Sequence, residues 1–322
     1  MTSSFRSSWP ALLLRRAFQV LAVGLIVGTL SFLMARALPG DMATRIAASR
    51  YGYDLVSNAA ADAVRAELGL DRPAGIALLH WWLDLAQLRL GTSLVSGETV
   101  WSEAAHELGA TLQLAGAATL IAAMVGLPLG VLCALRPGGW TDRAVLAASA
   151  VLRALPPFLL ALLLMLAFAL HLGVLPVAGD DAHGSLLLPA ATLGLGLAAG
   201  LARVARSALL EARALPSYEF ARTKGLGRMR VLLRHGLRAA AVPVLAYLGV
   251  QTVFLMEGAV VVESLFAWPG IGHALVHAVF GRDVPMIQGT ALCMGLLFVA
   301  FNLAVDAACL LLDPRARVRS EA

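Results

Sequence analysis

The sequence predicts an all-helical protein that crosses a membrane several times. Of its 322 residues, 59% are hydrophobic and only 14% are charged, whereas soluble domains carry about 25% charged residues. Six windows free of charged residues each reach about 18 residues, enough for a helix to cross a hydrocarbon core of roughly 30 Å. Helices are the expected spanning form, because lipid offers the backbone no hydrogen-bond partners. The windows cover residues 17–35, 108–135, 154–178, 184–202, 239–256 and 284–305.

The distribution of lysine and arginine predicts that both chain ends lie in the cytoplasm. With the N-terminus inside, the inner segments hold 18 basic residues and the outer segments hold seven. Six of those seven fall within residues 36–107, and long segments translocate largely regardless of charge. Membrane orientation therefore explains the net charge of +5, and we expect the lipid bilayer rather than nucleic acid as a partner.

Three regions are expected along the chain. Residues 1–35 hold a cytoplasmic N-terminal segment and the first transmembrane helix, which ends without a clear signal-peptide cleavage site. Residues 36–107 form an external loop that caps the outer face of the bundle. Residues 108–322 form the core, with five transmembrane helices and a cytoplasmic loop at 203–238.

The external loop is predicted to be partly helical. Asn58 is placed to cap a helix over residues 59–68. A second, amphipathic stretch at 76–90 carries Trp81 and Trp82, which suit a membrane–water boundary.

The core contains two further patterns with structural meaning. Residues 141–153 are charged at both ends and apolar between, so we expect them to lie along the inner membrane surface. Gly194, Gly196 and Gly200 form a small-residue face in the fourth window, which allows helices to pack closely in lipid.

The loop at 203–238 is the most polar part of the core. It carries nine basic residues against two acids, Glu211 and Glu219. Pro216 can start a short helix and Gly225 can end it in the left-handed conformation. About two turns are too short to be stable alone in water, so this helix must dock, either on its own bundle or on a partner protein. Its aromatic residues, Tyr218 and Phe220, are expected to be exposed unless a partner covers them.

Several motifs of catalysis and metal binding are missing, so an enzyme is not predicted. The sequence has no GxxxxGK[ST] loop for nucleotide phosphates and no GxSxG motif. His106 and Glu107 begin an HExxH pattern, but Ala110 stands where its second histidine belongs. We expect no cofactor and no metal on this chain. The weak metal candidates are His273 and His277, four residues apart.

Many short motifs agree with one known family. Glu219-Phe220-Ala221, followed by Gly225, resembles the EAA loop of ABC-importer permeases, with Phe220 in place of the middle alanine. The remaining matches are similar to the dipeptide, oligopeptide and nickel permeases, and they extend over nearly the whole chain. They include Leu38-Pro39-Gly40-Asp41, Leu68-Gly69-Leu70-Asp71-Arg72-Pro73, Gly126-Leu127-Pro128-Leu129-Gly130, Leu175-Pro176-Val177-Ala178-Gly179 and Val262-Glu263-Ser264-Leu265-Phe266-Ala267-Trp268-Pro269-Gly270-Ile271-Gly272.

The resemblance implies the type I importer fold, in the inner membrane of a bacterium. It implies a second homologous permease subunit, two ATPase subunits that bind ATP and Mg, and an extracytoplasmic substrate-binding protein. The long external loop resembles that of the first of two permease subunits. Residues 217–225 would be the coupling helix against the ATPase, with contacts from Tyr218, Glu219, Phe220, Ala221, Lys224 and Gly225.

The outer side of the core holds candidates for the translocation path or an outer gate. The resemblance implies this role for Glu263 and for Trp268-Pro269-Gly270. The alternative is a rigid turn with a tryptophan at the membrane interface. Glu257 is a candidate for a pathway or inter-subunit residue, since an ionisable group within a span is costly without a polar surrounding.

Three readings of the cargo and mechanism stay open. An importer of short peptides is favoured. The same architecture could carry nickel, a metal–chelator complex or a glutathione-like peptide, and His273 and His277 are the hint of metal. An ATP-independent channel or carrier is the alternative of another class.

Overall fold

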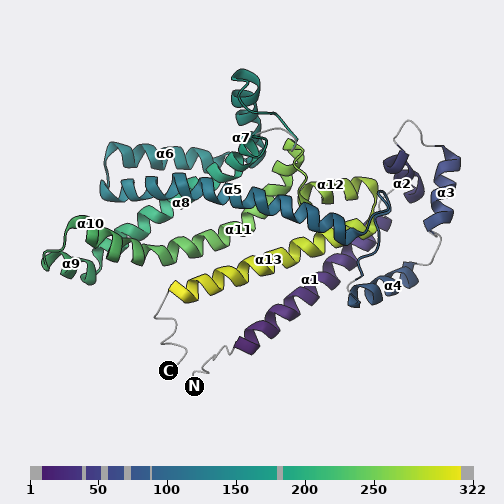
Figure 1. The fold of residues 1–322 in the computed structure, drawn as a ribbon, viewed down its shortest axis with the longest axis horizontal. Coiled ribbons are helices and arrows are strands. Elements are labelled where there is room, and N and C mark those ends of the chain that lie inside the picture. The colour runs from purple at the N-terminus through teal and green to yellow at the C-terminus, as the bar shows by residue number, and fades with distance from the viewer. Residues whose placement is uncertain are drawn as a thin grey trace. The chain divides into compact units, whose positions relative to one another are not determined.

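The computed structural model describes residues 9–37, 41–51, 57–68, 74–87, 89–179 and 184–312 (Figure 1). Within these residues the chain is helical, and extended pairing is limited to one isolated bridge between Thr92 and Thr99. The all-helical prediction is thus confirmed. The α-helices are α1 (Trp9–Ala37), α2 (Met42–Tyr51), α3 (Asn58–Leu68), α4 (Ala74–Ala86), α5 (Val100–Leu135), α6 (Trp140–Ala154), α7 (Pro157–Leu164), α8 (Leu187–Ala214), α9 (Pro216–Thr223), α10 (Arg228–Val231), α11 (Arg238–Phe266), α12 (Ile271–Gly281) and α13 (Val284–Leu312), and the π-helical turns are η2 (Met165–His171) and η3 (Leu232–Leu237).

Five helices of the described chain are long and apolar enough to span a membrane, or up to seven if each of two bent pairs counts as one span. The five stretches agree with five of the six predicted windows. They are Ala17–Met34, Val100–Leu135, Leu187–Ala214, Arg228–Gln251 and Val284–Ala304.

The remaining predicted window, 154–178, does not form one long helix. Its helical part is α7 with η2, which is bent by 107° from the preceding α6. The bend arises because Leu155 and Pro156 both take extended backbone conformations, after which Pro157 starts the new helix. Residues 141–153 thus belong to a helix of their own, α6, and their place along the inner membrane surface stays a prediction.

The described residues divide into two compact units. One joins the chain up to Thr111 with Pro269–Val299, and the other joins Leu112–Trp268 with the chain from Ala300. The first unit groups the external loop with α12 and much of α13. The predicted regions 1–35, 36–107 and 108–322 describe membrane topology and stay a prediction.

In the first unit, α1 and α4 meet through a glycine and two tryptophans. A methyl group on Gly28 would lie 1.9 Å from the indole of Trp81, so only glycine admits that ring. The indole of Trp82 donates a hydrogen bond to the hydroxyl of Thr29 at 3.3 Å. The helix predicted over 76–90 ends at Ala86, where the carbonyl of Asp84 accepts bonds from the amides of Gln87 and Arg89.

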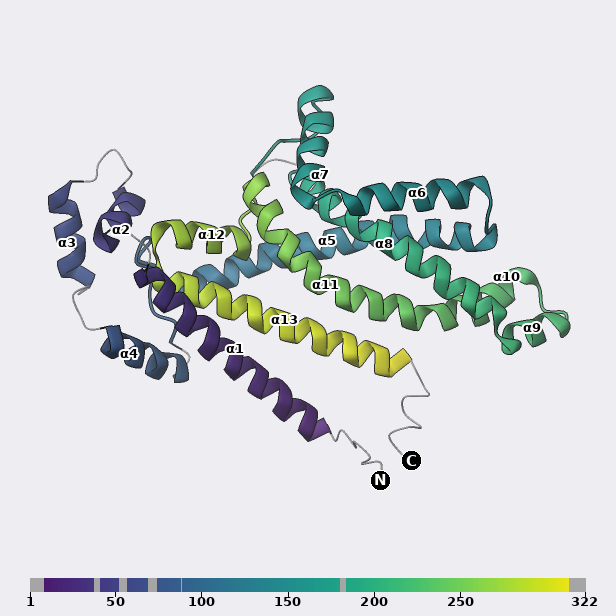
Figure 2. The ribbon, with the colours of Figure 1, turned by 180° about the vertical axis from the view of Figure 1, so that it is seen from behind.

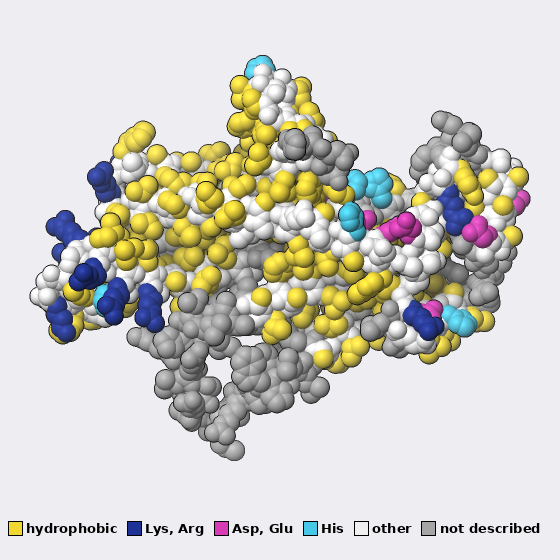
Figure 3. Space-filling model, in the orientation of Figure 1, with side chains coloured by type: hydrophobic (Ala, Val, Ile, Leu, Met, Phe, Trp, Pro, Cys, Tyr) yellow, Lys and Arg dark blue, Asp and Glu magenta, His cyan; other side chains and the backbone are white. Residues whose placement is uncertain are grey.

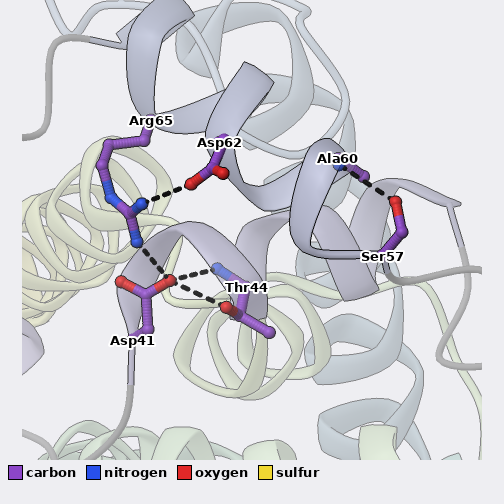
Figure 4. A network of polar contacts seen from close by, with 6 residues as sticks. All are labelled: Asp41, Thr44, Ser57, Ala60, Asp62 and Arg65. Carbon is purple, nitrogen blue, oxygen red and sulfur yellow. Dashed lines mark hydrogen bonds and ion pairs between the residues drawn. The ribbon is translucent and has the colours of Figure 1, made fainter.

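The cap of α3 differs from the prediction, and a helix before it, α2, has a cap of its own (Figure 4). The hydroxyl of Ser57, one residue before Asn58, accepts the amide of Ala60 at 3.1 Å and caps α3. Asn58 is the first helical residue, so the predicted cap is wrong by one position. The unpredicted helix α2 starts after Asp41, whose carboxylate accepts the amide of Thr44 at 3.1 Å.

In the second unit, α8 packs against α6, α7 and α11. Its contact with α5 depends on glycines, because methyl groups on Gly126, Gly130 and Gly194 would lie within 3 Å of backbone oxygens of the neighbouring helix. The predicted small-residue face is therefore only partly correct. A methyl group on Gly196 would meet no described atom within 4 Å, so that glycine is not needed for close packing.

Candidate functional site

The segment predicted to dock is the helix α9, which lies with α10 at one end of α8 and α11 (Figure 2). Leu215 is extended, Pro216 occupies the first helical position, and the helix ends at Thr223. Gly225 follows with a φ of +78°, a left-handed conformation that glycine adopts without strain. Both predicted boundaries are confirmed, because proline and glycine act through the local backbone.

One face of α9 is buried against its own chain. Tyr218 and Ala221 form a small core with Val231, against which Leu226 also packs. Gly236 allows this approach, since a methyl group there would lie 3.3 Å from the Tyr218 ring. Tyr218 is only 9% exposed. The expectation that Tyr218 is exposed is therefore wrong, because the following turn folds back over its ring.

The opposite face of α9 is exposed. Phe220 is 61% exposed, and Glu219 and Lys224 also face solvent. The ammonium group of Lys224 lies 4.6 Å from the centre of the Phe220 ring, within the range of a cation–π contact. The two docking alternatives thus apply to different faces of one helix: Tyr218 docks on the bundle, and Phe220 is available to a partner.

Basic side chains surround this exposed face. Lys and Arg groups gather over α9 and α10 (Figure 3). Such a concentration of one charge attracts acidic partners and speeds association with them. Between Arg222 and Arg234 the exposed basic residues are Arg222, Lys224, Arg228, Arg230 and Arg234.

Two other basic residues of the 203–238 loop have structural partners. Arg206 forms a bidentate ion pair with Asp142, which is 2% exposed. Arg213 donates a hydrogen bond to the carbonyl of Ala134, at the end of α5. Charge counting treated these residues only as topology signals. In the structure, Arg213 bonds the inner half of α8 to α5, and Arg206 bonds it to α6.

On the predicted outer side, Glu263 and Trp268 are both buried, at 0% and 6% exposure. Ala267 takes a left-handed conformation with φ of 49°, and the amide of Trp268 donates to the carbonyl of Glu263 at 2.9 Å. This is the geometry of a tight helix-ending turn, and the role of Glu263 and Trp268 in a translocation path or outer gate stays a prediction. The side chain of Glu257 lies outside the described residues.

Pro269 and Gly270 lead into α12. Gly270 is the residue before the helix, and the amide of Ile271 donates to the hydroxyl of Thr111 at 2.9 Å. The rings of His273 and His277 lie 4.4 Å apart, centre to centre, so the two share one face as predicted. Among the described residues, no group of three or more His, Cys, Asp or Glu side chains is arranged to hold a metal ion.

Sequence reasoning missed one polar arrangement, on the inner half of the second unit. Arg153 of α6 donates a hydrogen bond to the hydroxyl of Tyr247 of α11 at 3.0 Å. Both side chains lie against Gly200 of α8. The sequence offered no local signal for this contact, because spacing along the chain does not show which side chains of three separate helices meet.

Long apolar helices that carry one short helix among exposed basic side chains are the arrangement expected of a membrane-embedded transporter subunit that a partner protein contacts. The fold matches that of the MetNI methionine ABC transporter in an inward-facing conformation, with a TM-score of 0.54 and 21% identity over 65% of this chain and 95% of the other. The prediction of a type I importer permease fold is confirmed.

The family of binding-protein-dependent transport system inner membrane components matches residues 126–318, and the chain belongs to this family. A peptide transport system permease protein of Brucella abortus is 39% identical over 95% of this chain and 99% of its own length. The glutathione transport system permease protein GsiC of Salmonella choleraesuis is 35% identical over 95% and 98%. The chain is thus a permease subunit of an ABC importer in the bacterial inner membrane, as its motifs implied.

Proposed function

We propose that this permease subunit forms half of a translocation pathway for short peptides and that α9 receives the force that opens and closes it. The observation that carries the mechanical part is that α9 is buried on one face and exposed on the other. Tyr218 holds one face to the bundle, while Phe220 on the other face is 61% exposed.

The connections of α9 suit it to move the bundle. Leu215 alone separates it from α8, and its core partner Val231 leads through η3 into α11. Because α8 and α11 pack along each other, a displacement of α9 would be carried into both long helices. Packed helices shift as rigid bodies rather than deform.

The force would come from partner subunits. We propose that two ATPase subunits hydrolyse ATP with Mg, one of them against α9, and that a second permease completes the pathway. An extracytoplasmic protein would deliver the cargo, and this chain would bind no cofactor. Glu219, Phe220 and Lys224 would contact the ATPase directly, whereas Tyr218 and Ala221 would position the helix. Phe220 takes the place of a smaller residue, so the ATPase groove should be wide enough for a ring.

Peptides are favoured as cargo by the names of the relatives, one of peptide transport and one of glutathione transport. The test is uptake by the assembled importer in liposomes with ATP inside and the binding protein outside. We expect ATP-dependent accumulation of a radiolabelled di- or tripeptide. Accumulation of nickel or a nickel–chelator complex instead, with no peptide uptake, would favour the alternative suggested by His273 and His277.

The same preparation tests the channel or carrier alternative. We expect peptide uptake to stop when ATP is replaced by a non-hydrolysable analogue or when the ATPase subunits are left out. Uptake by this chain and the second permease without any ATPase would contradict an ATP-driven importer.

A further inference from the structure

A polar cavity lies between α6, α8 and α11, within the second unit. Its volume is about 480 Å³, in the range that holds small molecules. The charged and hydroxyl-bearing side chains that line it are Arg153, Arg203, Ser207, Glu211 and Tyr247.

The Arg153 end of the cavity is built around a glycine. A methyl group on Gly200 would lie 1.8 Å from the Tyr247 oxygen and 2.6 Å from Nη1 of Arg153. Glycine therefore lets the two side chains meet over α8, where Nη1 donates to the hydroxyl at 3.0 Å. The hydroxyl hydrogen of Tyr247 and the remaining N–H groups of Arg153 can still donate to a ligand.

The charges within the cavity are separated along α8. Arg203, Ser207 and Glu211 are four residues apart in turn and line one face of the helix. Within the part of the chain that the structure describes, neither Arg203 nor Glu211 forms an ion pair. Eight residues of helix place their backbones about 12 Å apart. Two guanidinium groups thus occupy one end and one carboxylate the other.

We propose that this cavity binds a zwitterionic di- or tripeptide, with its terminal carboxylate between Arg153 and Arg203 and its terminal ammonium toward Glu211. Guanidinium groups match a carboxylate by paired hydrogen bonds. Two to three extended residues span about 7–10 Å, and the Arg and Glu side chains cover the rest of the separation. This inference rests on the proposed peptide cargo and assigns the contacts that this chain makes with it.

The experiment measures equilibrium binding of a radiolabelled dipeptide to the permease–ATPase complex in neutral-lipid nanodiscs, without the binding protein. We expect Arg203→Gln to weaken binding of the free-acid dipeptide by about tenfold or more, the loss typical of a charge-assisted contact. The C-terminal amide should bind the wild-type complex as weakly as the free acid binds the variant. Glu211→Gln should weaken binding of the dipeptide by a similar factor, because the terminal ammonium loses its partner. An N-acetylated dipeptide, which lacks that ammonium, should bind the wild-type complex as weakly as the unmodified dipeptide binds Glu211→Gln.

Arg143→Gln is the matched control, because Arg143 is exposed on α6 and does not line the cavity; its binding should equal that of the wild type. Free-acid binding unchanged in Arg203→Gln would overturn the inference. So would an Arg203 effect that appears only with anionic lipid, because the cavity would then take a lipid phosphate. If the intact importer transports peptide but the variants bind the free acid, the amide and the N-acetylated dipeptide as the wild type does, only this inference fails. If it transports no peptide, the proposed cargo fails as well.

Discussion

The carboxylate of Asp142 accepts two hydrogen bonds from the guanidinium of Arg206, at 2.6 and 2.8 Å, and joins the start of α6 to the inner half of α8. The amide of Gly138 donates to the same carboxylate at 2.8 Å, which also holds the turn before α6. A single buried acid therefore organises the α5–α6 turn and its contact with α8.

Removing this acid should destabilise the second unit. Asp142→Ala leaves Arg206, whose side chain is 22% exposed, without its partner, and breaking such a pair is destabilising because one charge stays unpaired. We expect a lower unfolding temperature in detergent, measured by fluorescence-detected size exclusion. The double variant Asp142→Leu/Arg206→Met should recover part of the loss, since no charge is left buried. Equal unfolding temperatures for the wild type and Asp142→Ala would contradict this.

The two aromatic residues of α9 should separate stability from partner binding. Tyr218→Ala opens the core with Val231 and should cost about 3 kcal/mol of folding stability. Phe220→Ala should leave the unfolding temperature unchanged, yet weaken ATPase binding by about 2 kcal/mol, roughly thirtyfold. The measurements are thermal unfolding of this chain and titration of the ATPase onto it. Normal ATPase affinity in Phe220→Ala would show that the Phe220 ring does not take part in the coupling contact.

The left-handed residue after α9 gives a test with a close control. Gly225→Ala should cost about 1 kcal/mol because φ is +78° there, and Gly225→Pro cannot adopt this φ at all. We expect Gly225→Pro to lose ATPase binding while still inserting into the membrane. Gly227→Ala is the control, with φ of −57° and open space around it. Normal transport by Gly225→Pro would refute the role of α9 as the coupling helix.

Close packing of α5 on α8 predicts different outcomes for two glycines of α5. A methyl group on Gly130 would lie 2.6 Å from the carbonyl oxygen of Ala202, whereas one on Gly116 would meet nothing within 4 Å. Gly130→Ala should force the helices apart and cost about 1–3 kcal/mol. Gly116→Ala should be neutral or slightly stabilising. Both are measured by thermal unfolding, and equal effects of the two would show that α5 does not approach α8 this closely.

The cap of α2 should respond to acid. Hydrogen bonds from Thr44, helped by Arg65, hold the pKa of Asp41 below its ordinary value of 3.8. A lowered pKa in the folded state means that the contribution to stability is present above pH 3.8 and is lost as the pH falls through the folded-state pKa. After correction for the intrinsic pH dependence of exchange, we expect a smaller protection factor for the Thr44 amide at pH 2 than at pH 7. In Asp41→Asn the protection factor should no longer depend on pH in this way. If the same loss of protection persists in Asp41→Asn, another group is responsible.

Local signals predicted α9 well. A proline at its first position and a glycine after its end act through backbone geometry over a few residues, and both boundaries agree with the structure. The cap of α3 was predicted one residue too late, because Ser57 and Asn58 are both good capping residues. Only the backbone path decides which side chain reaches the free amide of Ala60.

The sequence alone could not show which of Tyr218 and Phe220 is buried and which is exposed. Both are aromatic, they lie two residues apart on a helix, and either could face a partner. The difference arises because α10 and η3 fold back over one side of α9 and cover Tyr218 alone. The cavity at Gly200 could not be predicted from the sequence either, because its polar residues come from three separate helices.

Composition, charge placement and motif order determined that this chain is a helical permease subunit, since those properties depend on the lipid solvent and on short stretches of backbone. The tertiary structure decided which polar groups are buried in pairs, which aromatic ring is left for a partner, and where a charged cavity forms. Those outcomes depend on contacts between residues distant in sequence, whose geometry no local pattern contains.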